Sequence, residues 1–315
     1  MTVAAAAPAR TWAHRHLLDV DALTREEIER VLELAVEMRA AGAARAHRSL
    51  LEAETVGLAF YEASTRTRVS FELAAKALGA TTVDLGIAGS SVVKGESFVD
   101  TLRTLERTGV TICVVRHAAS GAPYLAARTT GLRIVNGGDG LHAHPTQALL
   151  DALTLREALG GLDGRTVAIV GDIAHSRVAR SNLHALVALG ARVRLAGPPA
   201  FVNGFASGWP GVEVAASLAD ALSDADAVMT LRIQLERAAG GGVPSLRDYA
   251  RRWGLTEERM RLAAPGAPIL HPGPTNEGVE LTAELASSPR SLIGLQVENG
   301  VGVRMAVLAL LAEAA

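Results

Sequence analysis

The sequence predicts an α/β protein built from two doubly wound parallel-sheet domains, with its active site in the cleft between them. Strand-like and helix-like segments alternate along most of the 315 residues, a pattern typical of parallel sheets covered by helices on both faces. The chain is also long enough for two domains of ordinary size. The alternation begins afresh near residue 165, which places a hinge at about 145–165.

The first half is predicted to open with a helix and then form four strands. Residues 24–41 (TREEIERVLELAVEMRAA) combine apolar residues at helical spacing with acidic residues in the first turn, which predicts a helix. The same reading predicts strands at 55–60, 81–86, 110–116 and 132–138, and helices at 67–79, 97–109, 121–129 and 145–160.

The second half repeats this pattern, beginning with RTVAIVGD at 165–172 as a strand. Further strands are expected at 191–198, 227–232 and 267–274, with helices at 177–190, 217–226 and 244–255. The last residues, 297–315, are apolar at helical spacing and are expected to return to the first domain. We therefore expect one domain of residues 1–146 plus 297–315, and a second of residues 147–296.

Composition limits the classes of function. The chain is 49% hydrophobic with a formal net charge of −2, which does not favour a nucleic-acid surface. No apolar run approaches the roughly 20 residues of a membrane span. The single cysteine, Cys113, lies in an apolar run and excludes both an internal disulfide and a multi-cysteine metal site. The start of the chain lacks a signal-peptide core, so a cytoplasmic protein is expected.

Polar residues gather where the first predicted strands end, which is where open α/β sheets bind ligands. YEASTRTR follows the strand at 55–60 and places hydroxyls and two arginines at a helix N-terminus, a setting that favours anions. Taken alone, a single turn rich in Ser and Thr favours a helix cap, at Ser64 or Thr65, with solvated arginines. Arg116-His117 and HAHPTQ, with His144 and Gln147, follow the next strands.

The second half adds further cations at strand ends. Arg177 starts a helix after GDIAHS, and LRIQLER places Arg232 and Arg237 after a strand. Several arginines at strand ends of a nearly neutral chain indicate an anionic ligand with more than one acidic group. HPGP, at 271–274, offers backbone carbonyls beside prolines that have no N–H to compete.

Seven motifs in order resemble the aspartate/ornithine carbamoyltransferase family, from about residue 12 to the end of the chain. They are STRTR, SSVVKGES, RH, HAHPTQ, GDIAHSRVARSN, LRIQLER and HPGP. The resemblance implies transfer of a carbamoyl group from carbamoyl phosphate to an amino acid. It implies no metal and no cofactor, because phosphate is already a good leaving group and the site need only orient the reactants and stabilise charge.

The resemblance also implies how the carbamoyl phosphate is held. Ser64, Thr65, Arg66 and Thr67 would grip the phosphate, and Arg116 would contact both the phosphate and the carbonyl oxygen.

The remaining donor contacts follow from the same resemblance. His144 would polarise the carbonyl together with Thr67, while Gln147 and the backbone carbonyls of Pro272 and Gly273 would hold the carbamoyl NH2. Ser90 or Ser91 and Lys94 would reach into the site of a neighbouring subunit, which implies a homotrimer with shared active sites. By itself, the polar loop that carries Lys94 reads as an exposed linker.

For the amino acid, the resemblance assigns Arg177 to the α-carboxylate and Arg232 with Gln234 to a second carboxylate. Glu62 and Arg237 would form a pair that steadies these arginines. The second carboxylate clamp, and HPGP in place of the HCLP of the ornithine branch, favour L-aspartate as the acceptor. The product would be N-carbamoyl-L-aspartate, as in pyrimidine biosynthesis, and a regulatory or dihydroorotase partner chain is compatible with this branch.

Two departures keep other functions open. Glu277 stands where an arginine is usual after HPGP, and Leu141 stands where polar residues are common, so a different amino-acid acceptor is the main alternative. A non-catalytic assembly paralogue is disfavoured because the phosphate turn is intact. A dinucleotide-dependent dehydrogenase is disfavoured because the GDIAHS segment lacks G-x-G-x-x-G spacing.

Overall fold

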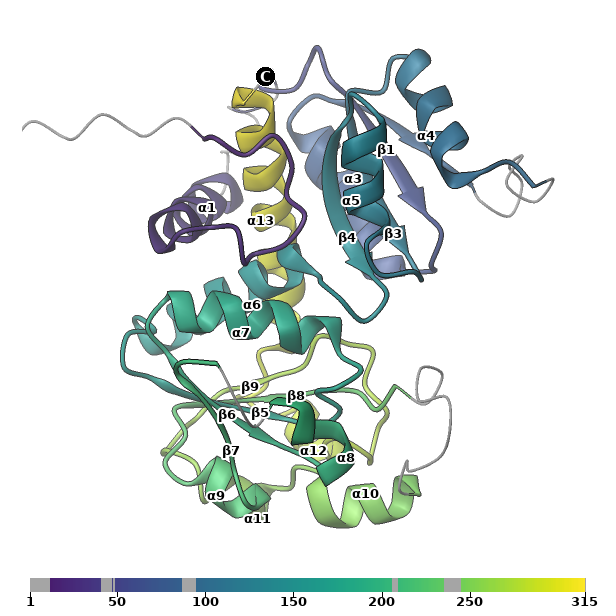
Figure 1. Ribbon diagram of the computed structural model, residues 1–315. Coiled ribbons are helices and arrows are strands. Elements are labelled where there is room, and N and C mark those ends of the chain that lie inside the picture. The colour runs from purple at the N-terminus through teal and green to yellow at the C-terminus, as the bar shows by residue number, and fades with distance from the viewer. Residues whose placement is uncertain are drawn as a thin grey trace, which may run out of the picture.

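The two predicted sheets are both present in the computed structural model, which describes residues 12–40, 47, 49–86, 95–205, 209–234 and 245–314. One sheet has the order β2-β1-β3-β4 and the other β7-β6-β5-β8-β9, and every strand pair in both is parallel. Figure 1 shows the first sheet above the second, with helices α6 and α7 between them. The predicted fold class is confirmed.

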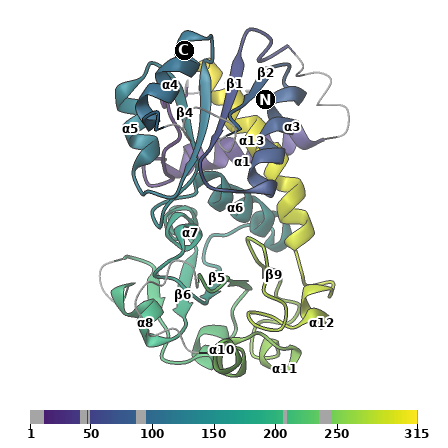
Figure 2. The ribbon, with the colours of Figure 1, turned by 90° about the vertical axis from the view of Figure 1, so that its right-hand side faces the viewer.

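The first sheet is covered on both faces. Its strands are β1 Thr55–Phe60, β2 Thr81–Asp84, β3 Ile112–His117 and β4 Arg133–Asp139. Its helices are α1 Arg25–Arg39, α3 Thr65–Ala77, α4 Phe98–Arg107 and α5 Ala122–Thr129. Figure 2 shows α4 and α5 on one side and α3 on the other. Alternate residues of β3 accordingly belong to different apolar clusters: Val114 to the cluster that includes Phe71 of α3, and Val115 to the one that includes Leu102 of α4.

The second sheet is built in the same way from shorter elements. Its strands are β5 Thr166–Val170, β6 Arg192–Ala196, β7 Val212–Val214, β8 Ala227–Thr230 and β9 Ile269–Leu270. Its helices are α7 Arg177–Ala188, α8 Pro199–Val202, α9 Leu218–Leu222, α10 Leu246–Trp253, α11 Glu257–Met260 and α12 Ala283–Ala286, with a 3-10 turn at Asn203–Phe205. The sequence did not predict β7, α8, α11 or α12, each of which is only three or four residues long.

Two long helices join the halves. α6, Pro145–Leu159, packs on α7 and on α13, Ile293–Glu313, and α13 also packs on α1 and α3 (Figures 1 and 2). The C-terminal helix thus packs against two helices of the first sheet, and its assignment to the first domain, like the expected domain boundaries, stays a prediction. α13 is long and apolar enough to span a membrane, but 72% of its apolar window is buried within the protein, as in a core helix.

Two of the helix starts that differ from the prediction lie beside the site. α3 begins at Thr65 rather than at 67, because the Ser64 Oγ accepts a hydrogen bond from the Thr67 N–H at 3.4 Å and caps the helix. α13 begins at Ile293 rather than at 297, which adds a turn that faces the other domain. β9 is only two residues long because the backbone turns away at the HPGP segment, whose prolines cannot donate to a strand ladder.

Candidate active site between the two domains

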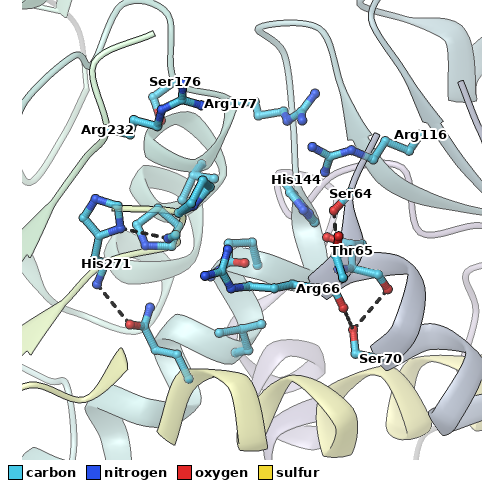
Figure 3. Close-up of a pocket in the computed structure, with 18 of the residues that line it drawn as sticks. Ser64, Thr65, Arg66, Ser70, Arg116, His144, Ser176, Arg177, Arg232 and His271 are labelled. Atoms are coloured by element: carbon cyan, nitrogen blue, oxygen red, sulfur yellow. Dashed lines mark hydrogen bonds between the residues drawn. The ribbon is translucent and has the colours of Figure 1, made fainter. Parts of the chain in front are cut away.

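A cavity of about 780 Å³ lies between the domains at the carboxyl ends of the strands. All the predicted site residues that the structure describes line it. They are Glu62, Ser64, Thr65, Arg66, Thr67, Arg116, His144, Gln147, Arg177, Arg232, Gln234, Pro272 and Gly273. Ser90, Ser91, Lys94 and Arg237 lie outside the described residues. Figure 3 shows Ser64 and Arg116 on one side, Arg232 and His271 on the other, and Arg66 extending between them.

The first turn of α3 forms one wall of the cavity. Ser64 is the N-cap in an extended conformation, and the turn contains no acidic side chain to offset the positive end of the helix dipole. The Ser70 Oγ donates to the carbonyls of Arg66 at 2.7 Å and Thr67 at 3.0 Å (Figure 3). These hydrogen bonds stabilise the backbone of the first turn. The result is a rigid helix N-terminus suited to an anion.

Glu62 orients two of the arginines. Its Oε1 accepts from Nη2 of Arg116 at 2.7 Å, its Oε2 accepts from Nη1 of Arg177 at 3.1 Å, and Nη2 of Arg177 also donates to Oε1. Gly138 makes room for both guanidinium groups: a Cβ built there would lie 3.0 Å from Nη1 of Arg116 and 3.0 Å from Nε of Arg177. Only glycine fits this strand end, since its φ is +113°.

His144 is held through its backbone. It is the N-cap residue of α6, followed by Pro145 at the first helical position. Its N–H donates to the Ser181 Oγ at 2.9 Å, and that hydroxyl donates to Oδ1 of Asp19 at 2.9 Å. The imidazole, in a residue only 4% exposed, lines the cavity from this fixed position.

Two buried carboxylates fix the backbone that carries Arg232 and Gln234. The N–H of Gln234 donates to Oδ2 of Asp172 at 3.2 Å, and that of Ile233 donates to Oε1 of Glu280 at 3.2 Å. Glu280 also accepts from the N–H of Asn276 at 2.8 Å, so it links this segment to the loop after HPGP. Burial raises the pKa of Glu280 above its ordinary value.

The HPGP segment closes the cavity from the second domain. The N–H of Gly273 donates to Nδ1 of His271 at 2.8 Å. Burial, followed by the charges of Arg66 and Arg232, lowers the pKa of His271 to about 4, so this imidazole is neutral at physiological pH. Gly273 has φ +66°, and a Cβ there would lie 3.0 Å from Cζ of Arg66. Arg66 of the first domain thus reaches the loop of the second.

The charge of the cavity is strongly positive. Five arginines line it, and among its described lining residues Glu62 is the only carboxylate. The five are Arg66, Arg116, Arg177, Arg232 and Arg304. This balance suits ligands with several negative charges, such as a phosphate together with a dicarboxylate.

Sequence reasoning missed several lining residues. Ser70, Ser176, His271, Gln296 and Arg304 belong to this group. The last two lie on α13, which the sequence indicated only as a core helix. Gln296 precedes the predicted helix at 297–315 and Arg304 lies within it, so the sequence carried no signal that both face the cavity.

The two residues that departed from the family pattern lie away from the cavity. Glu277 is exposed and Leu141 is half-buried, and neither is among the lining residues. Glu277 is therefore not part of the cavity wall that the described residues form.

Comparisons with known proteins agree over nearly the whole chain. A family profile described as "Aspartate/ornithine carbamoyltransferase, carbamoyl-P binding domain" matches residues 15–157, and "Aspartate/ornithine carbamoyltransferase, Asp/Orn binding domain" matches residues 163–311. The aspartate carbamoyltransferase catalytic subunit of Gluconobacter oxydans is 51% identical, with 96% of each chain covered. That of Roseiflexus sp. is 49% identical, with 98% of each chain covered.

Solved structures give the same result. Aspartate transcarbamoylase from Trypanosoma cruzi, in complex with carbamoyl phosphate and aspartate, superposes with a TM-score of 0.84 at 29% identity, covering 95% of this chain and 97% of that one. Ornithine carbamoyltransferase from Pyrococcus furiosus superposes with a TM-score of 0.84 at 30% identity, covering 96% and 98%.

Proposed function

Because the chain belongs to the aspartate/ornithine carbamoyltransferase family, we propose that it transfers the carbamoyl group of carbamoyl phosphate to the α-amine of L-aspartate. The products are N-carbamoyl-L-aspartate and phosphate. The observation that carries this proposal is the interdomain cavity, in which a helix N-terminus and five arginines surround a space of about 780 Å³. Full-length relatives of the aspartate branch at about half identity support the choice of acceptor.

In this proposal the first domain binds the donor. Ser64, Thr65, Arg66 and Thr67 hold the phosphate through the amides, hydroxyls and guanidinium of the α3 turn. Arg116, oriented by Glu62, bridges the phosphate and the carbonyl oxygen. Gln147, on the first turn of α6, holds the carbamoyl NH2 together with the carbonyls of the HPGP segment.

The chemistry is a displacement at the carbamoyl carbon. The deprotonated amine of aspartate attacks this carbon, the new C–N bond forms, and the C–O bond to phosphate breaks. His144, Arg116 and Thr67 stabilise the negative charge that develops on the carbonyl oxygen. The amine proton passes to the departing phosphate, so no protein carboxylate is required as a base.

The second domain selects the acceptor. Arg177 pairs with the α-carboxylate, and Arg232 with Gln234 pairs with the β-carboxylate. The positive charge of Arg232 would repel a cationic side chain such as that of ornithine. Glu277 is exposed and does not line the cavity, which is compatible with aspartate as the acceptor.

A homotrimer in the cytoplasm is the proposed working form. Ser90 or Ser91 and Lys94 would complete the site of the neighbouring subunit. Val69 and Leu73 of α3 are 39% and 52% exposed, and Val83 of β2 is 38% exposed, which leaves apolar surface beside an edge strand. Exposed apolar side chains at an open sheet edge favour an interface between copies.

Turnover by the purified chain tests the proposed function. Carbamoyl phosphate is supplied with a panel of amino acids that includes aspartate and ornithine, and phosphate and carbamoylated products are measured. Efficient reaction with aspartate and negligible reaction with ornithine is expected. A preference for another amino acid would contradict the assignment of aspartate as the acceptor. Absence of turnover with every amino acid of the panel would contradict the proposal that the protein is a carbamoyltransferase.

A further inference from the structure

A buried hydrogen-bond chain joins the two groups proposed to hold the carbamoyl NH2. Nε2 of Gln147 donates to Oδ1 of Asp151 at 2.8 Å, and Nε2 of Gln296 donates to the same oxygen at 2.6 Å. Oε1 of Gln296 accepts from the N–H of His271 at 3.0 Å, and Nδ1 of His271 accepts from the N–H of Gly273 at 2.8 Å. The chain thus runs from α6 through α13 to the HPGP segment, and all five residues are buried or half-buried.

Asp151 sets which way the two glutamine amides of this chain face. An ionised carboxylate only accepts hydrogen bonds, so both glutamine amides must turn their NH2 groups toward it. The side-chain carbonyl oxygen of Gln147 can then accept a hydrogen bond from a ligand in the cavity, and that of Gln296 accepts from the N–H of His271. Because His271 is neutral and accepts at Nδ1, it fixes the Gly273 N–H and with it the local backbone.

Two further residues keep Asp151 in this role. Nδ2 of Asn182 donates to its Oδ2 at 2.8 Å. Arg304 of α13 is buried nearby, and its positive charge favours the ionised carboxylate. The three hydrogen-bonding neighbours of Asp151 are therefore amide donors, and among the described residues the charge that acts on it is that of Arg304.

We propose that Asp151 is a specificity-determining positioning residue, which orients Gln147 so that the cavity presents hydrogen-bond acceptors to the NH2 end of the donor. This inference rests on the proposed function. It predicts selection of carbamoyl phosphate over acetyl phosphate, which has the same shape but carries CH3 in place of NH2. A site with buried acceptors rejects such an analogue because the acceptors are left unpaired.

The test compares ligands that differ only at this end. Asp151→Ala and Asp151→Asn are assayed with aspartate for kcat/KM of carbamoyl phosphate, and for competitive inhibition by acetyl phosphate and by inorganic phosphate. Thr154→Val is the matched control, because Thr154 is buried one turn along α6 and bonds to the Leu150 carbonyl and Asn299 rather than to Asp151.

In Asp151→Ala, kcat/KM for carbamoyl phosphate should fall by roughly 10-fold or more, while Ki for acetyl phosphate and for phosphate should stay within about twofold. Asp151→Asn keeps one acceptor oxygen, and Asn182 can turn its amide, so a fall of only about 3- to 5-fold is expected. A purely structural role would weaken all three ligands together.

The outcomes separate this inference from the proposed function. If wild-type protein makes no carbamoyl aspartate, the proposed function is wrong. If wild-type protein is active and both folded variants retain its discrimination, or lose affinity for all three ligands in parallel, the role of Asp151 is refuted. Should Asp151→Ala fail to fold, Asp151→Asn decides by the same comparison.

Discussion

The two arginines of the STRTR segment have different surroundings although they lie two residues apart. Arg66 lines the cavity with its guanidinium beside Gly273 of the other domain. Arg68 donates from Nη1 to Oδ2 of Asp84 at 2.6 Å, and both side chains are substantially exposed. A helical turn separates residues i and i+2 by about 200°, so only one of them can face the cavity.

Arg66→Ala is expected to reduce kcat/KM by about 100-fold or more, because the guanidinium proposed to hold the phosphate, which gains negative charge as it leaves, is lost. Arg68→Ala is the matched control and should stay within about threefold of wild type, since an exposed ion pair contributes little. Steady-state kinetics, with circular dichroism to verify folding, provide the measurement. Equal losses in the two variants would contradict the assignment of Arg66.

At the scale of elements, most residues of the site follow the carboxyl ends of strands, and the sequence predicted the positions of most of these strands. β1, β3, β4, β8 and β9 were each predicted close to their observed positions, so the residues that follow them could be named in advance. The contacts between those residues could not. Glu62 meets Arg177 across 115 positions, and Asp151 meets Gln296 across 145. Such pairs depend on how separate elements pack, which local periodicity does not encode.

The carboxyl end of β4 gives a second prediction. Gly138→Ala should raise KM for both substrates by about 10-fold, because the new Cβ would displace the Arg116 and Arg177 guanidinium groups and φ of +113° disfavours alanine. Gly204→Ala is the control, since a Cβ there meets no atom within 4 Å and its φ is not positive. Unchanged kinetics for Gly138→Ala would show that the two arginines tolerate displacement.

Helix α6 gives a prediction about pH. Burial raises the pKa of Asp151 from 3.8 to about 6. Between these values the folded protein binds more protons at this position than the unfolded chain does, so this group's contribution to stability increases as the pH falls from about 6 to 4. Relative to Asp151→Asn, the wild-type free energy of unfolding should therefore gain about 1 kcal/mol per pH unit in that window.

Denaturant unfolding of the wild-type and Asp151→Asn proteins at pH 4.5, 5.5 and 7 measures this difference. The gap between the two proteins should level off at about pH 7, where the Asp151 carboxylate is mostly ionised in the folded protein. A gap that stays constant down to pH 4.5, or that shifts in favour of the variant, would contradict a raised pKa for Asp151.

At the scale of the whole molecule, two sheets are held around one cavity by a continuous apolar layer. Leu149 of α6, Leu183 of α7 and Leu308 of α13 belong to the same buried cluster. Arg66 then reaches from one domain to the HPGP loop of the other. The sequence predicted this architecture from alternation alone, but it could not show that α13 supplies Gln296 and Arg304 to the cavity wall.

The proposed trimer predicts rescue between defective subunits. Arg66→Ala and Lys94→Ala proteins should each be nearly inactive. After mixing and confirmed subunit exchange, about one quarter of the sites would combine an intact Arg66 with an intact Lys94 from the neighbour. Activity approaching that fraction of wild type is expected, whereas no recovery would count against shared sites.

The central claim is that this cavity joins the carbamoyl carbon to the α-amine of aspartate. Carbamoyl phosphate labelled with carbon-13 and aspartate labelled with nitrogen-15 are incubated with the protein, and the product is followed by NMR. A new one-bond carbon–nitrogen coupling is expected to appear in step with phosphate release. Phosphate release without that coupling would contradict this claim.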